Sequence, residues 1–219
     1  MAMATESPAA AAFAGGAAAD AARTAWEWEG KVSSPVPAAT ADEAWALLSD
    51  FLAFHRWHPR VAACRLASGT PRALGCVRYC EGTPPDAGAG AADPDWAHET
   101  LLEYDAERRF FRYEMNDNNM GFGLFFATFR VVPAASGAGA AGCELRWEFE
   151  CEPVRGTPRE ALVARLQAGL DGMAARVHDH VLAARAAAGA PTTTPVAAGM
   201  EAAAAAGEQQ LKLDNSIAV

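Results

Sequence analysis

The stretch "CELRWEFECEPVRGTPREALVARLQAGL", residues 143–170, places the two clearest structural patterns of the chain side by side. In residues 143–152 apolar and charged residues alternate strictly, which is typical of a β-strand with one buried face. Thr157 and Pro158 then provide a helix start, and a helical apolar stripe follows: Leu162, Leu166, Leu170, Met173, Val177 and Val181. A half-buried strand followed by a long amphipathic helix predicts a sheet that covers its apolar face with that helix.

The chain before this stretch reads mainly as strands. "WEGKVSSPVP", residues 28–37, predicts a first strand, and Thr40 with Glu43 forms a capping box that opens a short helix over 40–51. A second helical turn is expected at 53–58, stopped by Pro59. Further strands are predicted at 61–67, 74–81, 97–104, 108–116, 122–132 and 142–152.

This order of elements predicts an α+β helix-grip fold over residues 26–187. A curved seven-stranded antiparallel sheet would wrap around the long C-terminal helix, with two short helices after the first strand. Because such a sheet curves more strongly than the helix can fill, we expect an internal cavity with mostly apolar walls. The alanine-rich residues 1–25 and the low-complexity residues 188–219 are predicted to be disordered tails.

Composition limits the classes of partner. The net charge is -9 and Lys31 and Lys212 are the only lysines, so nucleic acid and basic membrane-surface binding are not expected. No run of about 20 large apolar residues predicts a membrane span. The first 20 residues lack the basic segment of a secretory signal, so the prediction is a cytoplasmic protein, and we expect a monomer.

Five cysteines lie inside strand patterns: Cys64, Cys76, Cys80, Cys143 and Cys151. Their odd number and the absence of paired CxxC spacing indicate reduced core residues, not a zinc site or a disulfide framework. No phosphate loop, nucleophile elbow or zinc-protease motif occurs in the sequence, so no cofactor and no metal are expected. His55 and His58 are interpreted as solvated or cavity-rim residues.

The strand "GCVRYCEG", residues 75–82, carries a cation between cysteines, and "WAHETLLEYD", residues 96–105, carries a glutamate between apolar residues. Arg78 and Glu99 could therefore form a buried ion pair on neighbouring strands, together with Tyr113 and Thr128 on polar positions of later strands. The alternative is an exposed cross-strand pair worth less than about 1 kcal/mol. Strand parity leaves both interpretations open.

At these residues the chain resembles the plant lachrymatory-factor synthase family, which belongs to the START-like, birch-pollen-allergen-like superfamily that is also described as polyketide cyclase/dehydrase-like. The resemblance covers about residues 28–183 and rests on residues 28–59, on the two strands just quoted, and on "MGFGLFFATF" and "WEFECEPVRG". It implies that Arg78 and Glu99 are catalytic and face the cavity. It also implies a set of substrate-binding residues, to which we add the flanking inner positions: Tyr113, Phe125, Phe126, Trp147, Cys76 and Leu101.

The resemblance implies an isomerase that converts a small alkenyl sulfenic acid into a thial S-oxide, with a small hydrophobic or organosulfur ligand and no cofactor. Phe125 stands where the family has a tyrosine, so one polar contact of the synthases is missing. A non-catalytic carrier or receptor of small lipophilic ligands is the alternative. An abscisic-acid type receptor is disfavoured because "EGTPPD" replaces the receptor gate. The long connection 82–95 is either a cavity lid or a plain insertion.

Overall fold

The computed structural model describes residues 26–84, 93–134 and 142–189. The chain divides into two units, Met1–Val181 and Leu182–Val219, and the described part of the second unit is the C-terminal end of the last helix. The predicted tails lie outside the described residues, apart from 188 and 189, which end that helix. Most of the connection 82–95, residues 85–92, also lies outside them.

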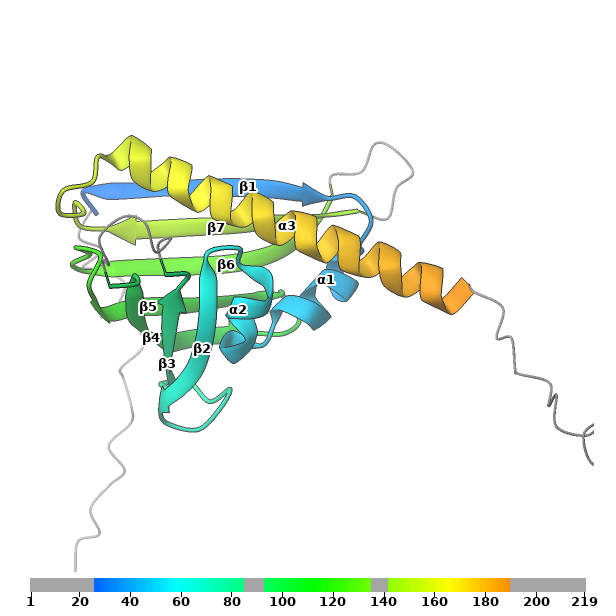
Figure 1. Ribbon diagram of the computed structural model, residues 1–219, viewed down its shortest axis with the longest axis horizontal. Helices are drawn as coiled ribbons and strands as arrows, with labels where there is room; N and C mark the ends of the chain where they lie inside the picture. Colours follow the sequence, from blue (N-terminus) through cyan, green and yellow to red (C-terminus); the bar gives the residue numbers. More distant parts are fainter. Residues whose placement is uncertain (1–25, 85–92, 135–141, 190–219) are drawn as a thin grey trace, which may run out of the picture. The chain divides into compact units, whose positions relative to one another are not determined.

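Seven antiparallel strands form one sheet in the order β1-β7-β6-β5-β4-β3-β2 (Figure 1). The strands are β1 Trp28–Val36, β2 Val61–Ser68, β3 Val77–Gly82, β4 Trp96–Asp105, β5 Phe110–Asn118, β6 Phe125–Pro133 and β7 Cys143–Cys151. The helices are α1 Ala41–Leu48, a 3-10 turn at Phe51–Ala53, α2 Phe54–Trp57 and α3 Arg159–Gly189. The predicted helix-grip architecture is confirmed, with the first and last strands as neighbours.

Two strands begin three residues later than predicted, β3 at Val77 and β6 at Phe125. Before β6, the Asn118 side-chain oxygen accepts hydrogen bonds from the backbone N–H groups of Met120 and Phe122 and holds a turn there. Gly121 in that turn has φ +85°, and a Cβ at this position would lie 2.9 Å from the carbonyl oxygen of Arg155. The chain therefore needs glycine here and cannot yet continue as a strand.

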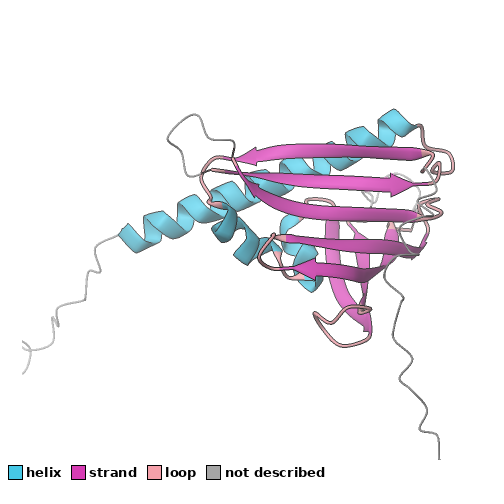
Figure 2. Ribbon diagram, turned by 180° about the vertical axis from the view of Figure 1, so that it is seen from behind, coloured by secondary structure: helices cyan, strands magenta, loops and turns pink. Residues whose placement is uncertain are grey.

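The inner face of the sheet is covered by helices. Along β7 buried and half-buried residues alternate without exception, as predicted. The stripe of α3 is buried at Leu162, Leu170, Met173, Val177 and Val181, whereas Leu166 is half-buried. Seen from behind, the strands lie in front of the helices, so all the helices of residues 26–181 are on one side of the sheet (Figure 2).

Side chains of α3 also satisfy the free edge of β1. Arg159 Nη2 donates to the carbonyl oxygen of Glu29 at 2.6 Å, and Gln167 Nε2 donates to that of Ser33 at 2.9 Å. The capping box of α1 is confirmed, because the Thr40 hydroxyl accepts from Glu43 N–H and the Glu43 carboxylate accepts from Thr40 N–H. These contacts satisfy backbone groups at an edge strand and at a helix start that would otherwise lack partners.

The prediction of five reduced cysteines was wrong for one pair. Cys64 and Cys80 form a disulfide between β2 and β3, with their Cα atoms 4.3 Å apart. The antiparallel register places the two residues directly opposite each other, and sequence spacing alone does not reveal such a register. Cys76, Cys143 and Cys151 are free and buried, and burial raises the thiol pKa of Cys143 and of Cys151 to about 11.

Candidate active site

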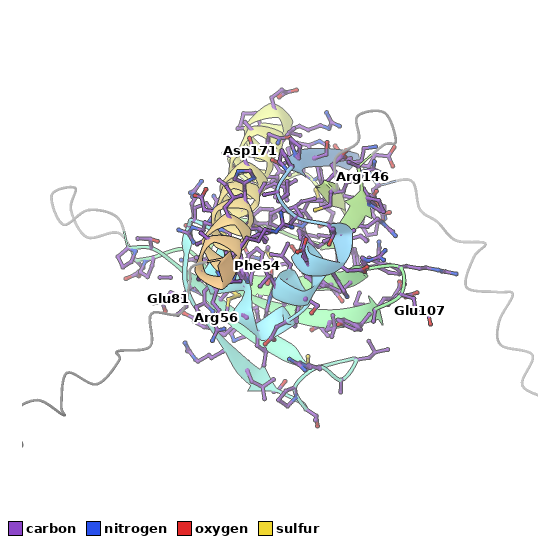
Figure 3. The ribbon with its side chains drawn as sticks, turned by 90° about the vertical axis from the view of Figure 1, so that its right-hand side faces the viewer. Phe54, Arg56, Glu81, Glu107, Arg146 and Asp171 are labelled. Atoms are coloured by element: carbon purple, nitrogen blue, oxygen red, sulfur yellow. A yellow bond between two sulfur atoms is a disulfide. The ribbon has the colours of Figure 1, made fainter. Side chains whose placement is uncertain are left out.

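A cavity of about 350 Å³ lies between the inner face of the sheet and the N-terminal half of α3. Its walls are mainly apolar and aromatic and come from α2, from strands β2 to β7 and from α3. Phe54 of α2 lies among the inner side chains, whereas Glu107 projects outward from the β4–β5 turn (Figure 3). A mainly apolar concave space with a few polar groups is the usual form of a small-molecule site.

Arg78 and Glu99 are directly opposite each other on β3 and β4. Arg78 Nε donates to Glu99 Oε2 at 2.6 Å, and the two side chains are 0% and 7% exposed. The pair is therefore buried on the inner face, which decides between the two interpretations that strand parity left open. A buried pair of this kind must satisfy itself, because water does not solvate it.

The Arg78 guanidinium is enclosed by aromatic rings. Its Nη1 donates to the carbonyl oxygen of Phe51 at 2.6 Å, and its central carbon lies 3.9, 4.6 and 5.2 Å from the ring centroids of Phe51, Phe54 and Tyr113. Its Nη2 is buried and has no hydrogen-bond partner among the described residues. Leaving this Nη2 group without a partner costs free energy. The faces of the three rings offset part of that cost, because a desolvated cation is attracted to aromatic quadrupoles.

Only the carboxylate of the pair borders the cavity. Glu99 is one of the lining residues, and Arg78 is not. The resemblance implied that both groups face the ligand. Arg78 instead fixes one oxygen of Glu99 and places a positive charge next to it.

Tyr113 and Trp147 form a second polar contact in the wall. Trp147 Nε1 donates to the Tyr113 hydroxyl at 3.1 Å, and both residues line the cavity. Burial, followed by the negative charge of Glu99, raises the pKa of Tyr113 far above its usual value. The phenol therefore stays protonated and can donate to a ligand or to Glu99.

The two phenylalanines at the start of β6 face opposite sides. Phe125 is buried and lines the cavity, whereas Phe126 is half-buried on the outer face, with its ring 5.3 Å from that of Trp26. Thr128 shares that outer face, opposite Arg112 and Glu148. Phe126 and Thr128 are thus not cavity residues, because residues two apart on a strand share a face.

Cys76 and Leu101 occupy inner-face positions, as expected, but they belong to the packed core. Both are almost completely buried, at 1% and 0% exposure, and neither lines the cavity. Of the predicted site residues, the structure therefore brings Glu99, Tyr113, Phe125 and Trp147 together around one space.

His58 is a cavity residue that the sequence analysis interpreted as solvated or at the rim. Its ring lies 4.9 Å from that of Phe54, and its Nδ1 accepts from the Arg60 N–H at 3.3 Å. Burial, and then the charges of Arg60, Arg78, Arg165 and Arg176, lower its pKa to about 4, so the ring is neutral at neutral pH.

A glycine inside α3 was the signal that could have located His58. A Cβ at Gly169 would lie 2.4 Å from His58 Nε2, and one at Gly172 would lie 2.5 Å from Cγ of Pro59. Glycine in a helix interior is unfavourable, so it often marks a close approach of another segment. Here the two glycines allow the α2–β2 connection to pack directly on the helix.

No group of three or more His, Cys, Asp or Glu side chains within residues 26–84, 93–134 and 142–189 could hold a metal ion. None of the helices in these ranges is both long enough and apolar enough to cross a membrane. The cytoplasmic location and the monomeric state stay predictions.

This chain matches one family model and is similar in structure to several solved proteins. Residues 27–178 match the family model described as polyketide cyclase / dehydrase and lipid transport. The protein XoxI from Bacillus cereus is similar in structure, with a TM-score of 0.55, 15% identity, and coverage of 72% of this chain and 97% of that protein. A solution structure from Thermobifida fusca has a TM-score of 0.54 and 28% identity, with coverage of 69% and 93%.

Proposed function

This chain belongs to the polyketide cyclase/dehydrase and lipid transport family, and on that premise we propose that it is a cavity enzyme in which Glu99 moves a proton on a small apolar ligand. The observation that carries this proposal is the position of Glu99, whose carboxylate borders the cavity while Arg78 holds one of its oxygens at 2.6 Å. The reaction that we assign is the isomerisation of an alkenyl sulfenic acid to a thial S-oxide, as in the lachrymatory-factor synthases that the sequence resembles.

The chemistry needs one group that both takes and returns a proton. The Glu99 carboxylate accepts the proton of the sulfenic O–H, and the electron pair left on oxygen is delocalised through sulfur. A C=S bond then forms as the C=C bond becomes single, and the same carboxyl donates the proton to the alkenyl carbon distal to sulfur, while the S–O bond is kept. No net proton is consumed. Negative charge develops on the ligand beside Glu99, and the buried Arg78 cation next to it stabilises that charge where water is excluded.

The wall of the cavity supports this role. Phe54, Phe125 and Trp147 present apolar surface to the ligand, and the protonated Tyr113 hydroxyl is a neutral hydrogen-bonding group in the same wall. An apolar wall keeps a reactive sulfenic acid away from water and from other thiols.

Size favours a second candidate, a non-catalytic carrier of lipophilic molecules. A volume of about 350 Å³ corresponds to about twelve water molecules, more than a sulfenic acid with three carbons would fill. In a carrier, Arg78 and Glu99 would only satisfy each other.

The test supplies the purified full chain with an alkenyl sulfenic acid generated in the reaction mixture and measures thial S-oxide by gas chromatography and mass spectrometry. We expect product formation that falls at least about 100-fold in Glu99→Gln. Glu150→Gln is the matched control, because it makes the same change in the outer pair with Arg112. No product from the wild type, together with saturable binding of an apolar dye in both variants, would establish the carrier instead.

A further inference from the structure

Arg165 of α3 lies in a partly exposed part of the cavity wall. Its Nη2 lies 2.7 Å from Asp95 Oδ2, at the entry to β4, and 3.2 Å from the sulfur of Met120 in the β5–β6 connection. All three residues line the cavity. The Arg165 guanidinium thus links α3 to the segment before β4 and to the β5–β6 connection, next to the space that the ligand would occupy.

The ion pair is of a kind that a ligand can replace. The side chains of Arg165 and Asp95 are 38% and 47% exposed, and such exposed pairs contribute little to stability. Both contacts of Arg165 within the described residues use Nη2, whereas a guanidinium has five N–H donors. An incoming carboxylate could therefore take the place of Asp95, or join it, at small cost.

The backbone around this part of the wall is held in place. Gly82 N–H donates to the carbonyl oxygen of Asp95 at 2.7 Å, and Thr83 N–H donates to that of Arg60 at 3.0 Å. Arg60 lines the cavity as a second cation beside the same frame. The acidic residues among the lining are Glu81, Asp95 and Glu99, and Glu99 is already paired with Arg78.

His58 lies close enough to the same cations to feel their charge. After burial, four arginines lower its pKa, among them Arg60 and Arg165. Two arginines in a mainly apolar wall suit a molecule with an anionic end and an apolar body.

We propose that Arg165, with Arg60, binds the carboxylate of an amphipathic ligand whose apolar body extends into the cavity toward Glu99. This inference rests on the proposed function, because it assumes that the cavity holds a small molecule, and it names the class of that molecule as a monocarboxylate. Met120, Phe122 and Leu166 provide the apolar surface next to the carboxylate. The free volume beyond a three-carbon sulfenic acid is then used by the rest of the ligand.

The test compares decanoate with decanol, two probes of equal chain length, by isothermal titration calorimetry on the full chain. We expect decanoate to bind about tenfold more tightly, and Arg165→Gln to remove that difference without changing the affinity for decanol. Asp95→Asn should act in the opposite direction and strengthen decanoate binding, because it removes the competing carboxylate. Arg108→Gln is the matched control, since it breaks an exposed pair with Asp105 in the β4–β5 turn, and neither residue lines the cavity.

The outcomes separate the two proposals. Equal affinity for both probes, or a preference for decanoate that survives Arg165→Gln, would overturn the carboxylate site and leave the cavity proposal intact. If neither probe binds the wild type, the small-molecule cavity itself is refuted, and this inference falls with it.

Discussion

Arg78 and Glu99 face each other across β3 and β4 at 2.6 Å, yet only Glu99 borders the cavity. The pair could have two roles, contact with a ligand and stabilisation of the fold, and this arrangement allows them to be tested separately. The carboxylate can contact a ligand, whereas the guanidinium acts through the carboxylate. The pair is also a stability element, because both side chains are withdrawn from bulk solvent, at 0% and 7% exposure.

Replacing only one residue of this pair should destabilise the protein more than replacing both. Arg78→Met leaves the Glu99 carboxylate buried without its cation, and we expect a loss of about 3–5 kcal/mol in the free energy of unfolding. The double variant Arg78→Met/Glu99→Leu should be more stable than Arg78→Met alone, because it leaves no charge in the core. Urea unfolding of the wild type, both single variants and the double variant measures this coupling; strictly additive losses would contradict it.

Acidic pH should destabilise the protein through His58. Its pKa is lowered from 6.5 to about 4 in the folded state, so below pH 6.5 the unfolded chain binds the proton more readily. The contribution of the neutral ring is fully present above pH 6.5 and is lost as the pH falls toward 4. It amounts to at most about 3 kcal/mol, less because the ring is partly exposed.

The measurement is the free energy of unfolding of the wild type minus that of His58→Gln at several pH values. Carboxylates elsewhere in the protein titrate in both proteins, so their contribution cancels in this difference. The difference should decrease between pH 6.5 and pH 4, and a constant difference across this range would refute the prediction.

Thiol counting tests the disulfide between β2 and β3. Three of the five cysteines are free in the structure, so three thiols should react after denaturation without reductant and all five after reduction. Reduction should lower the free energy of unfolding by about 3 kcal/mol, given the sequence separation of 16 residues. The variant Cys64→Ser/Cys80→Ser should be insensitive to reductant. Five reactive thiols in the unreduced protein would mean that the bond does not form.

Alanine at position 169 tests the packing of the α2–β2 connection on α3. Although alanine favours a helix by about 1 kcal/mol over glycine, its Cβ would lie 2.4 Å from His58 Nε2, so we expect a net loss of about 1–3 kcal/mol. Gly189→Ala is the control, because a Cβ there meets nothing within 4 Å. Thermal unfolding compares the two variants. Relief of the loss in Gly169→Ala/His58→Ala would identify the imidazole as the obstacle, and a stabilised Gly169→Ala would contradict the close contact.

The fold could be predicted because its signals are local. The alternation along residues 143–152 and the stripe of α3 each match the burial pattern of one element, and the order of elements leaves one way to cover the sheet. Strand parity left two interpretations of Arg78 and Glu99, an inner pair and an outer pair, and the structure shows the inner pair. Parity could not choose between the faces, because both faces of residues 74–81 carry apolar side chains.

By itself, the sequence determined which residues alternate, where the helices begin and that one long helix must cover one sheet, because backbone periodicity and capping act within a few residues. Tertiary structure alone decided the partnership of Cys64 with Cys80, the outward face of Phe126, the place of Arg78 next to Glu99 and the contact of Arg165 with Asp95. These depend on the register between strands and on the seating of α3 over the sheet. Both arise from packing among segments far apart in the chain, which no local pattern records.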